Sequence, residues 1–149
     1  VCWYGMGKTE CGEYRGLDFV IMMAIGKGLE TDFRKDYVKS KRKETAAIWQ
    51  GNSGFNIAEI VKYAPSSCNT QPWFVTCENN NLNVYRIEGG KSIMPKEKIH
   101  YYNSIDMGIF LCILEITLMR KNYKFSRILC DGSMDSSGRM KIAEYAFSK

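Results

Sequence analysis

The feature that most constrains the fold is a continuous apolar segment at residues 105–119 of this 149-residue chain. Ser104 precedes the segment as a helix cap, Asp106 lies in the expected first turn, and Arg120 and Lys121 follow the last turn. These placements suit the helix dipole, which favours acidic residues at the start and basic residues at the end. Because apolar residues surround this predicted helix on every side, other elements or a partner chain must enclose it.

The same segment is too short and too charged to span a bilayer, because a membrane helix needs about 20 consecutive, mainly apolar residues. Asp106 and Glu115 both lie within it. We therefore expect no membrane partner and a soluble, cytoplasmic protein. The six cysteines are interpreted as free thiols in a reducing compartment, since no signal peptide precedes them. With His100 as the only histidine and no Cys-x-x-Cys pair, we expect no metal site.

Shorter patterns predict strands on both sides of this helix. Apolar alternation predicts two strand pairs, the first a hairpin at residues 73–77 and 82–87 and the second at residues 125–130 and 140–147. Two apolar runs closed by glycines predict further strands at residues 1–4 and 17–25.

A second helix is predicted over residues 55–64, where apolar residues recur at spacings of three and four before Pro65. Residues 89–101 are expected to form a connecting loop, and residues 29–43 to be irregular or to hold a short helix. The expected fold class is therefore α+β, with helices packed on one mainly antiparallel mixed sheet and a buried central helix. We expect a single domain over residues 1–149.

Several common functional motifs fail on inspection. Gly7-Lys8-Thr9 lacks the earlier glycine of a phosphate-binding P-loop, and Gly26-Lys27-Gly28 lacks the third glycine of a dinucleotide fingerprint. His100, the only histidine, lies in an expected loop, and no convincing Ser-His-Asp triad can be assembled around it. The net charge of +5 permits an anionic ligand, but no basic stripe interleaves with aromatic residues, so we expect no nucleic acid partner.

The informative segment is Ala-Pro-Ser-Ser-Cys-Asn-Thr-Gln-Pro-Trp at residues 64–73. Pro65 ends the preceding helix, polar side chains fill most of the next positions, and Pro72 restricts the residue before it to extended conformations. Such a rigid polar loop can present donors and acceptors to the edge of a planar heterocycle. The alternative is a helix-to-strand connector whose side chains bond only their own backbone. The residues alone favour the connector.

This decapeptide resembles the A-P-S-x-x-N-x-Q-P-W signature of the nitroreductase family, whose members bind FMN and transfer hydrides from a nicotinamide. Further segments resemble the family in the same order: residues 103–109 resemble the Asp-x-Gly start of its long central helix, and residues 39–43 fall where it has an Arg-Lys element. Residues 1–5 and 24–28 resemble a subgroup that joins two nitroreductase-like halves in one chain. Because Val1 does not read as a natural start, we expect a C-terminal fragment of a longer chain.

The resemblance implies that flavin lies at an interface between two protomers or two halves. One set of residues would face the ring and ribityl chain: Pro65, Ser66, Ser67, Asn69 and Gln71. A second set, Lys41, Arg42 and Lys43, would bind the phosphate through charge-assisted bonds, unless this basic run is a solvated loop. No side chain is assigned as acid, base or nucleophile, because the cofactor carries the chemistry of such proteins.

The function implied is that of an FMN-dependent oxidoreductase, which uses NAD(P)H to reduce nitro-aromatic or quinone-like compounds by hydride transfer through flavin N5. Its partner would be a small-molecule electron acceptor. The alternative is a non-catalytic flavin-binding or scaffold module of the same fold, since the phosphate-binding arginines of the family usually lie in a first half that we expect this chain to lack. A homodimer formed through the helix at residues 105–119, or a missing N-terminal half, would supply the other side of the interface.

Overall fold

The computed structural model divides the chain into two units, Val1–Tyr37 and Val38–Lys149. It describes residues 15–17, 26–32, 36, 40–51, 56–78, 81–87 and 95–148. In the first unit the described residues form a turn at Arg15 and Gly16 and the short 3-10 helix η2 (Glu30–Asp32). The strand predicted at residues 1–4, and all but Leu17 of the one at residues 17–25, lie outside the described residues. The single domain over residues 1–149 stays a prediction.

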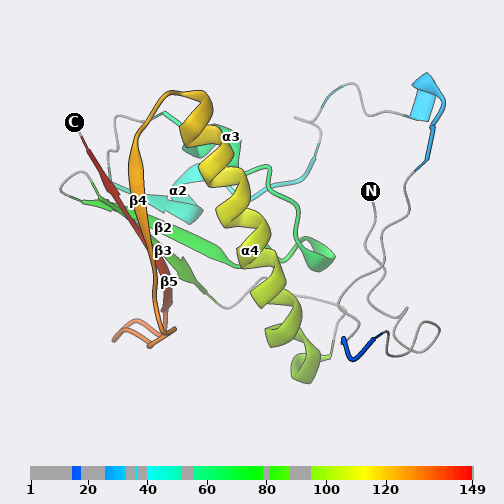
Figure 1. Ribbon diagram of the computed structural model, residues 1–149. Coiled ribbons are helices and arrows are strands. Elements are labelled where there is room, and N and C mark those ends of the chain that lie inside the picture. Colours follow the sequence, from blue (N-terminus) through cyan, green and yellow to red (C-terminus); the bar gives the residue numbers. More distant parts are fainter. Residues whose placement is uncertain are drawn as a thin grey trace. The chain divides into compact units, whose positions relative to one another are not determined.

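The second unit is built on a five-stranded mixed sheet with the strand order β1-β2-β3-β5-β4. The strands are β1 (Trp49–Gln50), β2 (Trp73–Glu78), β3 (Asn81–Arg86), β4 (Phe125–Leu129) and β5 (Met140–Phe147). Only β1 pairs in parallel, with β2, and the other neighbours are antiparallel. The expected α+β class with a mainly antiparallel mixed sheet is confirmed (Figure 1).

Both predicted strand pairs form close to their predicted bounds. In β3 the side chains of Leu82 and Val84 are buried and their neighbours are half-buried, as the two-residue period of a strand requires. Leu82 lies opposite Tyr145 of β5, and Val84 lies opposite Val75 of β2, so the buried residues share one face of the sheet. Strand β4 is the exposed edge.

The long helix α4 (Lys96–Arg120) begins earlier than predicted. The expected loop at residues 89–101 is wrong from position 96 onward, because Pro95 occupies the N-cap position and the fixed φ of proline suits the entry to a helix. Ser104 is therefore not a cap: its hydroxyl donates to the carbonyl of His100 (2.9 Å) inside the helix. Asp106 lies in the helix interior rather than in its first turn.

The end of α4 follows the sequence prediction. Asn122 adopts a positive φ of 60°, its amide donates to the carbonyl of Met119 (2.9 Å), and the amide of Tyr123 donates to that of Leu118 (3.0 Å). This is the Schellman pattern, which satisfies the last carbonyl groups of a helix and tolerates asparagine at the left-handed position.

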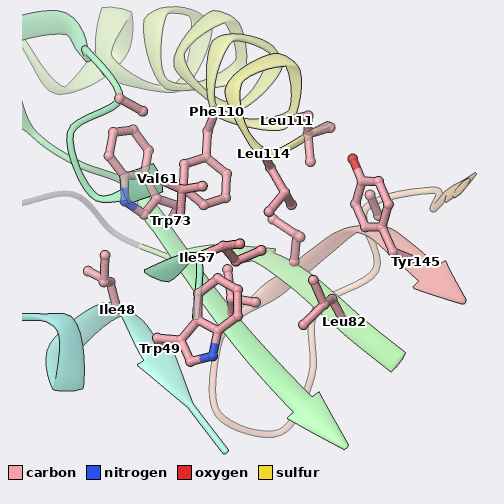
Figure 2. Close-up of a cluster of buried hydrophobic side chains, with 14 of the residues drawn as sticks. Ile48, Trp49, Ile57, Val61, Trp73, Leu82, Phe110, Leu111, Leu114 and Tyr145 are labelled. Carbon is pink, nitrogen blue, oxygen red and sulfur yellow. The ribbon is translucent and has the colours of Figure 1, made fainter. Parts of the chain in front are cut away.

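Helix α4 crosses one face of the sheet and supplies the centre of the core (Figure 1). Its buried apolar residues follow the helical spacing of three and four: Met107, Phe110, Leu111, Leu114 and Leu118. The Phe110 ring stacks on the Trp73 indole with 4.8 Å between ring centroids. Figure 2 shows the two rings side by side. Opposite them, Ile116 and Met119 are exposed, so the described residues enclose the helix on one side.

By length and composition alone, Glu97–Arg120 could cross a membrane, with a mean hydropathy of 1.4 in its most apolar window. The buried face of this helix packs on the sheet, as the central helix of a folded domain does.

Two short α-helices lie among the other described residues of the unit. Helix α2 (Thr45–Ile48) leads directly into β1. Helix α3 (Ala58–Val61) packs against α4 and is shorter than the predicted helix at residues 55–64, part of which lies outside the described residues. From Val61 the chain continues through a turn to Pro65 and then into the polar loop.

Candidate functional site

The polar loop at residues 65–72 connects α3 to β2 and contains the 3-10 turn η4 (Ser67–Asn69). Three of its residues have φ in the left-handed region: Cys68 (50°), Asn69 (54°) and Gln71 (49°). The expectation that Pro72 holds the preceding residue extended is therefore wrong at Gln71. Asparagine visits this region more readily than most residues, but each such residue still costs roughly 1–3 kcal/mol. A backbone of this kind persists only where contacts with the surrounding residues hold it.

Helix α4 holds the loop from one side. Asp106 Oδ1 accepts hydrogen bonds from the amide (2.8 Å) and the hydroxyl (3.1 Å) of Ser67. One turn earlier on the same helix face, Asn103 Oδ1 accepts a bond from the hydroxyl of Thr70 (3.1 Å). All four of these residues are buried. The loop is therefore anchored to the helix at two points.

Asp106 is an unusual residue for the interior of a domain. Its side chain is 0% exposed, and its second oxygen, Oδ2, has no hydrogen-bond partner among the described residues. Burial raises the pKa of this carboxyl group, and the two bonds from Ser67 oppose the rise. Sequence reasoning assigned Asp106 to the helix dipole and missed its contact with the loop; the spacing of three between Asn103 and Asp106 was the available signal.

The basic run holds the loop from the other side. Arg42 Nη1 donates to Asn69 Oδ1 (2.9 Å), and Arg42 Nη2 donates to the carbonyl of Tyr63 (3.3 Å). The amide of Lys43 donates to Gln71 Oε1 (2.7 Å), and Lys43 Nζ donates to the carbonyl of Gln71 (2.9 Å). Partial burial lowers the pKa of Lys43. The two residue sets singled out in the sequence thus meet within one chain.

The position of Asn69 is fixed by both neighbours. Its Oδ1 accepts from Arg42, while its Nδ2 donates to the carbonyl of Lys41 (3.1 Å). Asn69 and the side chain of Lys41 are nevertheless exposed. These two side chains are the polar groups of the site that solvent, or a ligand, can reach most easily.

Other loop residues are used inside the protein. Ser66 Oγ accepts the amide of Gln71 (2.9 Å), and Gln71 Nε2 donates to the carbonyl of Asn69 (3.3 Å). Gln71 and Ser67 are buried and Ser66 is half-buried, whereas Pro65 is exposed. These internal bonds are the pattern that the connector interpretation predicts, and they restrict the direct ligand contacts to a subset of the loop.

The described surroundings of the loop do not suggest a metal centre. Among the residues that the structure describes, no group of three or more histidine, cysteine, aspartate or glutamate side chains could hold a metal ion. The arrangement can present a rigid polar edge flanked by positive charge. Such an edge suits a ligand that combines a polar ring with an anionic group.

A family model described as "Putative TM nitroreductase" matches residues 1–118. The match spans the basic run, the polar loop and most of α4. No curated protein and no solved structure shows a significant match to the chain.

Proposed function

The chain belongs to this nitroreductase family, and from that membership we propose that it is an FMN-dependent oxidoreductase in which NAD(P)H is the hydride donor. A nitro-aromatic or quinone-like small molecule would be the acceptor. The family indicates an oxidoreductase in general, and the cofactor and the acceptor class are our proposal. The observation that supports it most directly is the contact of the basic run with the loop, Arg42 on Asn69 and Lys43 on Gln71.

The chemistry of these residues fits the proposed cofactor. FMN combines a planar ring with polar edges and a dianionic phosphate. The exposed Lys41 offers an ammonium group for the phosphate, and Lys43 Nζ donates to a carbonyl oxygen rather than to a carboxylate. The Asn69 amide offers a hydrogen-bonding group whose orientation the basic run fixes. When bound, FMN would supply hydride transfer at N5, and the protein residues would bind and orient it.

One chain would supply only one side of such a site. We propose that a second copy of the chain, or an N-terminal half, covers the exposed face of α4 and completes the interface. Ile116 is 44% exposed and Met119 is 55% exposed on this face, and burying large apolar side chains drives association. Light scattering that shows a monomer at every concentration would exclude the homodimer. We also propose that the protein acts in the cytoplasm.

The second candidate function is a flavin-binding or scaffold module without turnover. The internal bonds of Ser66 and Gln71 favour it, because they leave few loop side chains for a ligand. It predicts FMN binding without acceptor-dependent oxidation of NAD(P)H, whereas the oxidoreductase predicts both.

The experiment is a titration of the purified chain with FMN and, in parallel, with riboflavin, which lacks the phosphate. Lys41→Met should weaken FMN binding about tenfold, the value of one lost charge-assisted bond, and leave riboflavin binding unchanged. Lys121→Met, which removes an exposed lysine at the far end of α4, is the matched control and should change neither. A colourless protein that takes up no FMN would refute the flavoprotein assignment.

A further inference from the structure

The loop keeps its strained backbone although only one of its three left-handed residues, Asn69, is of a type that tolerates this conformation well. Cys68 is exposed, so packing of its side chain does not hold it at φ 50°. The neighbouring Ser67 is bonded to Asp106 through both its amide and its hydroxyl. One restraint on Cys68 therefore comes through Ser67, on its N-terminal side, and the bonds of Asn69 to Arg42 and Lys41 act on its C-terminal side.

Asp106 is placed to supply that restraint. In the described part of the chain, its carboxyl group accepts hydrogen bonds from Ser67 alone. One carboxylate oxygen accepts two bonds from a residue 39 positions away in sequence. The buried, unpartnered Oδ2 makes the position unfavourable unless the bonds to Ser67 repay it. A hydrophobic residue in the helix interior would avoid this cost, so the carboxyl group has a local task.

We propose that Asp106 is a positioning residue that holds the loop in its left-handed conformation and thereby sets the affinity of the site for its ligand. The ligand class rests on the proposed function and is FMN. Asp106 does not touch the ligand. It acts through Ser67 on the backbone at Cys68 and Asn69, and so on the exposed amide of Asn69.

The test removes the hydrogen bonds from Ser67 to Asp106 and, in a second variant, relieves the left-handed strain at Cys68. Asp106→Ala removes the acceptor and should weaken FMN binding at least tenfold, with faster hydrogen exchange at the Ser67 amide. Asp106→Asn keeps an acceptor oxygen in place and should bind FMN within a few-fold of wild type. Glu97→Gln, at the exposed start of α4, is the control for loss of a carboxylate.

The decisive variant is Cys68→Gly in the Asp106→Ala background. Glycine adopts left-handed φ without the penalty that other residues carry, so position 68 no longer needs the restraint. The double variant should recover most of the FMN affinity lost in Asp106→Ala. If Cys68→Gly gives no recovery while both proteins are folded by circular dichroism, Asp106 is a buried structural residue only and the proposal is overturned.

Failure of the proposed function gives a different result. If wild type binds no FMN, the cofactor assignment fails, but exchange of the Ser67 amide in the ligand-free protein still reports on Asp106. Protection of that amide unchanged by Asp106→Ala would overturn the positioning role by itself.

Discussion

Replacing Gly51 with alanine should weaken the pairing of β1 with β2. Strand β1 follows the basic run in the chain and joins that segment to the sheet. Gly51 follows β1 directly and has a φ of 90°. A Cβ atom added there would lie 2.2 Å from the carbonyl oxygen of Cys77 in β2, a backbone atom that cannot rotate away. Alanine must therefore either shift β1 away from β2 or change the backbone conformation.

The cost of the substitution has two parts. Left-handed φ costs a residue with a Cβ roughly 1–2 kcal/mol. The displacement that relieves the overlap is comparable to overpacking of a core, which costs about 1–3 kcal/mol. Alanine also lowers the conformational entropy of the unfolded chain relative to glycine, which stabilises the folded state by about 0.4–1 kcal/mol. Gly51→Ala should therefore lower the free energy of unfolding by about 3 kcal/mol (range about 1–5), a large share of the roughly 5–15 kcal/mol that a domain has.

Urea unfolding, followed by the fluorescence of Trp49 and Trp73, measures this change. With a slope of about 1–3 kcal/mol per molar urea, the midpoint should fall by about 1 M or more. Gly108→Ala is the matched control, because a Cβ at this helix position meets no atom within 4 Å and alanine should stabilise the helix by about 0.8–1 kcal/mol. The same chemical change thus has opposite signs at the two sites. A Gly51→Ala midpoint equal to that of wild type would refute the described pairing of β1 with β2.

Three further predictions follow from other contacts. Because burial raises the pKa of Asp106 above its ordinary value of 3.8, the folded state holds this proton more tightly, and stability should fall as pH rises from 3.8 through the raised pKa. Asp106→Asn should lose this pH dependence when urea midpoints are measured across the acidic range. If the midpoints of the wild type and the variant depend on pH equally, the raised pKa of Asp106 is contradicted. Tyr145→Phe removes the buried hydroxyl that donates to Glu115 (2.8 Å) and should cost about 1–3 kcal/mol in the same assay, and no loss would show that this bond is not formed. Arg42→Met should weaken binding of FMN and riboflavin alike, because it releases Asn69; loss of FMN affinity alone would mean that Arg42 binds the phosphate directly.

The parts of the fold that could be predicted from the sequence are those with a local cause. The hairpin of β2 and β3 and the pair β4 and β5 follow from two-residue alternation, and Arg120 with Lys121 marked the end of α4. The predicted start of α4 was wrong because the sequence offers two possible N-terminal signals, Ser104 and Pro95. Ser104 preceded the apolar run, and Pro95 stood before a polar stretch that a solvent-facing helical turn can also accommodate.

The candidate site also has a part that the sequence predicts and a part that it does not. The motif at residues 64–73 could be located from the sequence, because its residue types are unusual in that order. Its contacts could not be predicted: Arg42 and Asn69 are 27 positions apart, and Ser67 and Asp106 are 39 apart. No local pattern specifies which of many polar side chains meet when α4 packs beside the loop. The left-handed residues were also unforeseen, because cysteine and glutamine do not indicate such a backbone.

The two interpretations of the loop, connector and ligand site, describe different side chains of the same segment. Ser66, Ser67 and Gln71 bond inward and determine the backbone, as a connector requires. Asn69 and Lys41 remain at the surface, and the inward bonds determine where they point. A strained loop held from two sides is costly for a mere connection, since a relaxed turn could join α3 to β2. The cost is explained if the conformation itself, with Asn69 fixed beside positive charge, is what the protein needs.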